Sequence, residues 1–136
     1  MTFYQKVCDT IFKLYLYGDM AKMIHYSTDS AHGHKLSDEV REAIVEFADD
    51  LAEQFFGYYG KPRFDELSLN VDVNKEEDLN KLCQLCLQEI EEISSEIEKN
   101  KKLSGIMSLI DNFKEKISKI SFLGTFDKVS NFKLKK

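Results

Sequence analysis

Proline interrupts this chain only once, at Pro62, and that scarcity is the strongest constraint on its fold. Proline breaks helices because it lacks a backbone N–H and clashes with the preceding turn. Only six glycines accompany it among 136 residues, so long stretches contain no residue that would end a helix. Within these stretches apolar residues recur every three or four positions, which is the spacing of one helix face. The chain is therefore predicted to be all-α.

The apolar spacing predicts four helices in a single domain that covers residues 1–136. They are expected at about residues 2–28, 30–59, 74–98 and 104–124, with the second starting anywhere between 30 and 37. Gly60 and Pro62 are typical of a helix end and should stop the second helix. Asn74 with Glu77 forms a variant of the capping box that starts a helix. Gly124 is expected to end the fourth helix and leave a short flexible tail at about residues 125–136.

The connection between the second and third helices is long. Residues 61–73, if extended, reach roughly 40 Å, which is about the length of a 25-residue helix. The other two connections are short turns, which place their helices antiparallel. Two antiparallel hairpins joined by a long crossover make a ferritin-like four-helix bundle, with the second and third helices parallel. An up-down-up-down bundle with a long loop is the alternative. Within the connection, an alternation of apolar and polar residues indicates an extended segment on a surface: Leu67, Leu69, Val71 and Val73.

Composition argues against several classes of protein. A net charge of −5 disfavours nucleic-acid binding. The apolar runs are too short to span a membrane and the first residues lack a secretory signal, so we expect a soluble, cytoplasmic protein. Three cysteines are an odd number, which argues against a disulfide scaffold. Cys83 and Cys86 lie in a helical pattern without a second pair to complete a zinc site, so core packing is the favoured role.

Histidines and acids gather on the predicted second helix. Advancing by about 100° per residue, five of them share one sector beside the apolar face. They are His34, Asp38, Glu42, Asp49 and Glu53, while Glu39, Glu46 and Asp50 are expected to be ordinary solvated acids. A bound cation would relieve the repulsion between the carboxylates, and imidazole with carboxylate suits iron, manganese or zinc. A charged edge facing water, with His25 and His34 as helix-end or packing residues, explains the same pattern without a metal.

Residues 23–61 resemble a group of small phage-encoded proteins related to the Dps branch of the ferritin-like superfamily. That group has a histidine before an aromatic residue, a T-x-S sequence, a histidine before a lysine, an aspartate four residues before a glutamate, and a closing G-x-x-G-K. The matching residues here are His25 with Tyr26, Thr28 with Ser30, His34 with Lys35, Asp49 with Glu53, and Gly57, Gly60 and Lys61. Residues 105–126 loosely resemble the last helix of the group.

The resemblance also extends to a metal-binding pattern. Dps proteins carry histidine, aspartate, aspartate and glutamate at steps of four, eleven and four, and this chain repeats those steps at His34, Asp38, Asp49 and Glu53. The resemblance implies an iron-binding ferroxidase centre shared across a two-fold interface, with manganese or zinc as alternative ions. It would combine His25, His34 and Asp38 of one subunit with Asp49 and Glu53 of another, and Glu42 as an alternative ligand or neighbouring acid. At least a homodimer is implied, in the cytoplasm of a bacterial host.

The chain also departs from Dps. His25 lies closer to His34 than the corresponding pair does, Tyr26 replaces the usual tryptophan, and no lysine-rich arm precedes the first helix, which argues against DNA binding. An E-x-x-H motif is absent, which disfavours a di-iron site inside one bundle. The alternative function is therefore a non-catalytic phage structural or interaction protein, with virion proteins as partners, that keeps the bundle without a working metal centre.

Overall fold

The computed structural model describes the chain except residues 68–72 and 135–136, and describes side chains as far as Thr125. It contains the helices α1 (Phe3–Ser27), α2 (Ala31–Tyr59), α3 (Leu79–Lys99) and α4 (Ser104–Leu134). Two short 3-10 turns, η1 (Phe64–Glu66) and η2 (Lys101–Leu103), precede α3 and α4. No strand occurs in the part of the chain that the structure describes. The predicted all-α four-helix bundle is confirmed.

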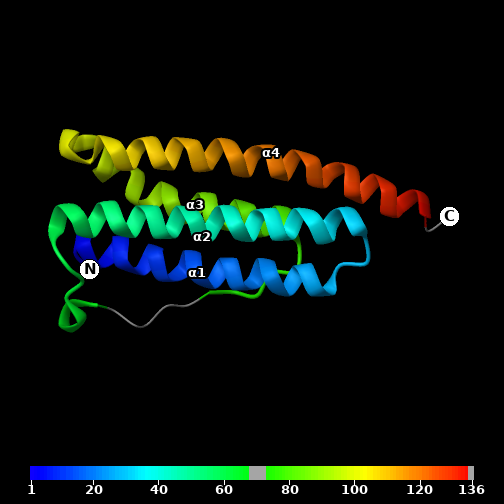
Figure 1. Cartoon of the computed structure of the whole chain (residues 1–136), viewed down its shortest axis with the longest axis horizontal. Helices are drawn as coiled ribbons and strands as arrows, with labels where there is room; N and C mark the ends of the chain where they lie inside the picture. The colour runs from blue at the N-terminus through cyan, green and yellow to red at the C-terminus, as the bar shows by residue number, and fades with distance from the viewer. Residues whose placement is uncertain (68–72, 135–136) are drawn as a thin grey trace.

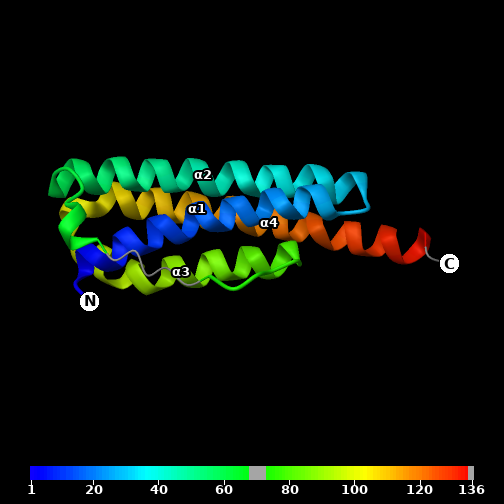
Figure 2. The same ribbon diagram turned by 90° about the horizontal axis from the view of Figure 1, so that it is seen from below.

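The order of the helices in space follows the predicted connectivity (Figures 1 and 2). α1 and α2 form one antiparallel hairpin, α3 and α4 form another, and α2 and α3 run in the same direction. η1 lies beside the end of α2, whereas residues 73–78 lead into α3 toward the opposite end of the bundle. Each helix packs against two antiparallel neighbours, α1 on α2 and α3, and α4 on α2 and α3. Antiparallel neighbours bring opposite ends of the helix dipoles together, which favours this arrangement.

The connection from α2 to α3 is tied to the bundle at both of its described ends. Leu67 and Val73 pack against the core, while Leu69 and Val71 lie outside the described residues. Near η1, the Tyr4 hydroxyl accepts a hydrogen bond from the Arg63 N–H (3.1 Å), and the Arg63 guanidinium lies 4.2 Å from the centre of the Tyr4 ring. A cation over an aromatic face is an attractive contact. These contacts hold the start of the crossover against α1.

Two predicted helix boundaries are wrong. α3 begins at Leu79 and not near Asn74, because the Asp78 carboxylate accepts hydrogen bonds from the backbone N–H groups of Asn80 and Lys81. Asp78 is thereby the N-cap, and it satisfies two of the N–H groups that a helix start leaves open.

α4 continues through Gly124 to Leu134, so the predicted helix end at Gly124 is also wrong, and residues 125–134 of the predicted tail are helical. A Cβ atom at this position would lie 2.9 Å from the Asn80 Oδ1. The glycine therefore allows α4 to approach the start of α3 closely, a role that a local sequence pattern does not distinguish from helix termination.

The core is apolar and continuous through the bundle, with Phe55, Ile44, Leu82 and Ile110 among its fully buried side chains. Cys83 and Cys86 are buried in it as free thiols. Burial raises the pKa of the Cys83 thiol to about 12, so this group stays protonated and unreactive. None of the described helices is long and apolar enough to cross a membrane.

Candidate metal centre

His25 and His34 face each other across the turn between α1 and α2. Their rings stack with centroids 3.5 Å apart and planes inclined by 27°. The Nδ1 of His25 donates to the carbonyl oxygen of His34 (2.7 Å), and the Nδ1 of His34 donates to the carbonyl oxygen of His25 (2.8 Å). The carbonyl of His25 lies in the last turn of α1, where helix carbonyls lack an intrahelical donor. The histidine pair thus joins the two helices at their turn.

These hydrogen bonds determine which ring nitrogen carries the proton. A carbonyl oxygen can only accept, so both Nδ1 atoms must be protonated. In the neutral form of each ring the Nε2 atom then keeps its lone pair, which is the atom that binds a metal. Metal-binding histidines are commonly oriented in this way, with the other ring nitrogen bonded to a carbonyl or carboxylate. His25 is buried and His34 is exposed, so the pair joins the core to the surface.

Asp38 lies one turn further along α2, beside the histidine pair. Its Oδ1 is 3.0 Å from the Lys22 Nζ and 3.7 Å from the His25 Nδ1. The hydrogen bond from Lys22 holds the pKa of Asp38 below its ordinary value, with a smaller contribution from His25. The carboxylate is therefore ionised at neutral pH. The fold brings His25 next to His34 and next to Asp38, but among the described residues the three do not form a group whose ligand atoms all lie within 4.8 Å of one another. We call these three predicted ligands the histidine half-site.

A second group of acids lies further along α2. One carboxylate oxygen from each of Asp49, Asp50 and Glu53 lies within 4.8 Å of the other two. The predicted pair of Asp49 and Glu53 is thus present, and we call these three residues the acidic half-site. Asp50, which the sequence analysis placed among the ordinary solvated acids, also belongs to this group by distance. Tyr15 of α1 is close to this group, since Asp49 and Glu53 add to the burial that raises the pKa of its hydroxyl.

The structure also places Glu42, the third histidine and the two half-sites along α2. Glu42 is exposed and, among the described residues, belongs to no group of three possible ligands. His32, which was not a predicted ligand, donates from Nε2 to the carbonyl oxygen of Leu123 (3.0 Å) and so links α2 to α4. Asp38 and Asp49 are eleven residues apart on one straight helix, about 16 Å at a rise of 1.5 Å per residue. One chain therefore cannot bring both half-sites to one ion.

The sequence offered no direct signal for Lys22 or Tyr15, because their positions beside the acids depend on how α1 rotates against α2. In retrospect, Tyr15 belongs to an exposed row of large side chains that fall within one sector of α1. The row consists of Phe12, Tyr15, Leu16, Met23 and Tyr26. Such a row marks a face that the bundle itself does not cover.

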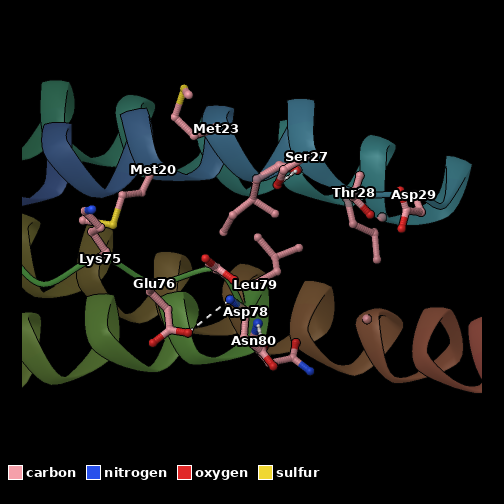
Figure 3. Close-up of a pocket in the computed structure, with 15 residues that line it drawn as sticks. Met20, Met23, Ser27, Thr28, Asp29, Lys75, Glu76, Asp78, Leu79 and Asn80 are labelled. Atoms are coloured by element: carbon pink, nitrogen blue, oxygen red, sulfur yellow. Dashed lines mark hydrogen bonds between the residues drawn. The ribbon is translucent and has the colours of Figure 1, made fainter.

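A separate pocket of about 830 Å³ opens near the start of α3 (Figure 3). Its lining includes Met20 and Ile24 from α1, Leu36 from α2 and Leu79 from α3, with acidic side chains such as Glu76 at one side. It exists because α3 begins short of the α1–α2 turn along the bundle axis, which leaves that end of the bundle partly uncovered. None of the candidate metal ligands lines it.

Comparison with known proteins places the chain in a family. A model of the family of unknown function DUF5856 matches residues 25–123. The chain belongs to this family. The matched region extends from His25 to Leu123 and so contains both half-sites and Glu42. No curated protein and no solved structure matches the chain.

Proposed function

We propose that the protein binds iron in the manner of Dps, at centres that two subunits complete together, and oxidises ferrous iron there. The observation that carries this proposal is the histidine pair, whose Nδ1 atoms are both occupied by carbonyl oxygens. The Nε2 atoms are then the ones that could bind a metal, while the ionised Asp38 lies 3.7 Å from the Nδ1 of His25. Two imidazoles beside a carboxylate form a ligand set that suits iron, manganese or zinc.

A shared centre follows from the separation of the half-sites. If a second subunit places its α2 antiparallel to the first, with a two-fold axis near Val45, each histidine half-site meets an acidic half-site. Two equivalent centres then form per dimer. Such an interface would also cover part of the exposed row on α1, which includes Phe12 and Leu16. Apolar side chains exposed together on one face are typical of a surface that binds a partner.

In such a centre the protein would supply ligands and charge. Carboxylate oxygens from the acidic half-site favour the ferric over the ferrous ion because they are hard anionic ligands, and the imidazoles hold the ion in place. Ferrous iron is the substrate, and peroxide or oxygen accepts its electron. The bundle with a long crossover, the two half-sites and the resemblance to Dps support the same function.

The test uses two damaged variants and their mixture. His34→Ala with Asp38→Ala removes one half-site, and Asp49→Ala with Glu53→Ala removes most of the other. Each variant alone should lose metal binding and ferroxidase activity, while co-expressed subunits should recover part of both, because a heterodimer rebuilds one of its two centres. Metal analysis and ferrous oxidation rates measure the outcome. Glu39→Ala with Glu46→Ala, on the same helix but off both half-sites, should match the wild type.

If heterodimers form but stay inactive, the shared-centre model is wrong. A second function becomes the better explanation if the wild type binds no iron, manganese or zinc. The exposed row on α1 favours a non-catalytic role as a structural or interaction protein of a phage, in which this face binds a partner protein. The histidine pair would then serve only to join α1 to α2.

A further inference from the structure

The pocket near the start of α3 combines apolar and acidic side chains. Ile24 of α1 and Leu36 of α2 are 8% and 2% exposed, and they line the pocket together with the half-buried Met20 and Leu79. Its volume of about 830 Å³ is in the range of pockets that hold small molecules. Such pockets are mostly apolar, with a few polar groups that decide which ligand binds. The polar groups of this pocket therefore indicate the chemistry of its ligand.

Negative charge predominates among these polar groups. The described residues that line the pocket include one lysine, Lys75, and four acids, Asp29, Glu76, Glu77 and Asp78. Within the described part of the chain, no ion pair involves Asp29, Glu76 or Glu77. The Glu76 carboxylate is held in place, because its Oε1 accepts a hydrogen bond from the Asp78 backbone N–H (3.1 Å; Figure 3). Carboxylates of one sign around a pocket with apolar walls attract a cation.

We propose that this pocket binds a small organic cation with a hydrocarbon body, such as a primary alkylamine in its ammonium form. Ile24, Leu36 and Met20 cover the hydrocarbon body, and Glu76 and Glu77 balance the charge of the ammonium. A neutral apolar molecule leaves these carboxylates without a counter-charge, an anion is repelled by them, and an inorganic cation gains nothing from the apolar side chains. No candidate metal ligand lines the pocket, so this inference is independent of the proposed function.

The experiment titrates the full chain with octylammonium, octanol and octanoate, which share a hydrocarbon body and differ in charge. Calorimetry should give the tightest binding for octylammonium and the weakest for octanoate. The methionines report where the probe binds, because Met20 and Met23 line the pocket while Met1 and Met107 lie outside it. With methyl-labelled methionine, octylammonium should shift the NMR signals of Met20 and Met23 and leave that of Met107 unchanged.

A charge-neutral variant tests the carboxylates. Glu76→Gln with Glu77→Gln removes two charges and keeps an oxygen that can accept the Asp78 N–H. It should bind octylammonium about twofold to tenfold more weakly, the range for two partly exposed charge pairs, and bind octanol like the wild type. The matched control is Glu39→Gln with Glu46→Gln. These α2 acids, one half-buried and one exposed like the first pair, lie outside the pocket, so this variant should bind all three probes like the wild type.

Several results would overturn the inference. Equal affinity for the three probes, or a preference for octanol or octanoate, would show that the acids do not select a cation. Equal loss of octylammonium binding in both glutamine variants would assign the effect to overall charge and not to the pocket. Failure of octylammonium to bind, or shifts at Met107 without shifts at Met20 and Met23, would exclude the pocket as its site.

Discussion

Two lysines of α1 each pair with a carboxylate of another helix, and the pKa of the two carboxyl groups shifts in opposite directions. Lys22 and Asp38 meet at the exposed α1–α2 face, where the pKa of Asp38 is lowered. Lys13 and Glu89 meet at the α1–α3 interface, 3.3 Å apart, where side-chain exposures are only 25% and 11%. There burial raises the pKa of Glu89, although Lys13 and Thr10 both favour its ionised form. The direction of the pKa shift therefore depends more on how far the carboxyl group is removed from water than on its lysine partner.

Asp9 is a second buried acid of α1, and the charge of Lys13 only partly offsets the effect of its burial. Asp9 is 8% exposed and its Oδ1 makes no hydrogen bond, and burial raises the pKa of its carboxyl. Ionisation of Asp9 and Glu89 is therefore costly to the folded state, whereas Asp38, at the α1–α2 face, is ionised beside Lys22. The two faces of α1 thus differ in how much solvent reaches their acids, and with it in the charge state that each acid favours.

The largest expected effect is a loss of stability on changing two cysteines of α3, and it tests whether these thiols only pack in the core. Changing Cys83 and Cys86 together to alanine should lower the free energy of unfolding by about 1 to 3 kcal/mol, because buried volume is lost. The metal content should not change. Chemical denaturation and metal analysis of the same preparation check both points. Loss of one zinc ion per chain would show that these thiols bind metal.

A smaller effect, of opposite sign, is expected at Asp9. Asp9→Asn should raise the free energy of unfolding at pH 7 by about 1 kcal/mol, because it removes a desolvated charge. The raised pKa means that the folded state binds this proton more tightly than the unfolded state, so the cost exists above the folded pKa. The difference between variant and wild type should shrink as the pH falls toward 4. A difference that stays constant between pH 7 and pH 4 would contradict the role of ionisation.

The smallest effect is expected at Asp38, where solvent screens the charge. Asp38→Asn should lower the melting temperature of the metal-free protein only slightly at neutral pH, since exposed ion pairs contribute little. Because the pKa of Asp38 is lowered in the folded state, its contribution is present at neutral pH and is lost as the pH falls through that pKa. Melting curves at pH 7 and pH 3 should therefore differ in the wild type more than in the variant. A large loss of stability at pH 7 would mean that the Lys22 pair is structural.

Periodicity and chain length predicted much of the fold and part of the candidate site. Helical spacing placed α1 and α2 nearly at their observed bounds, and the length of the connection after Pro62 predicted that α2 and α3 run parallel. The i, i+4 pairs of His34 with Asp38 and of Asp49 with Glu53 follow from the helix repeat alone. These features depend only on the local sequence or on the length of a connecting segment, so they can be predicted without knowing how the helices pack.

The other features of the fold and the candidate site depend on how the helices are rotated about their axes and shifted along them relative to one another. The reciprocal hydrogen bonds of His25 and His34, the placement of Lys22 on Asp38 and the burial of Asp9 are contacts between elements that no spacing rule fixes. The misassigned role of Gly124 has the same origin, because its close neighbour Asn80 lies on another helix. By itself the sequence determined which residues share a helix face. The tertiary structure alone decided which of those faces meet, and burial and solvent then set the charge state of each acid.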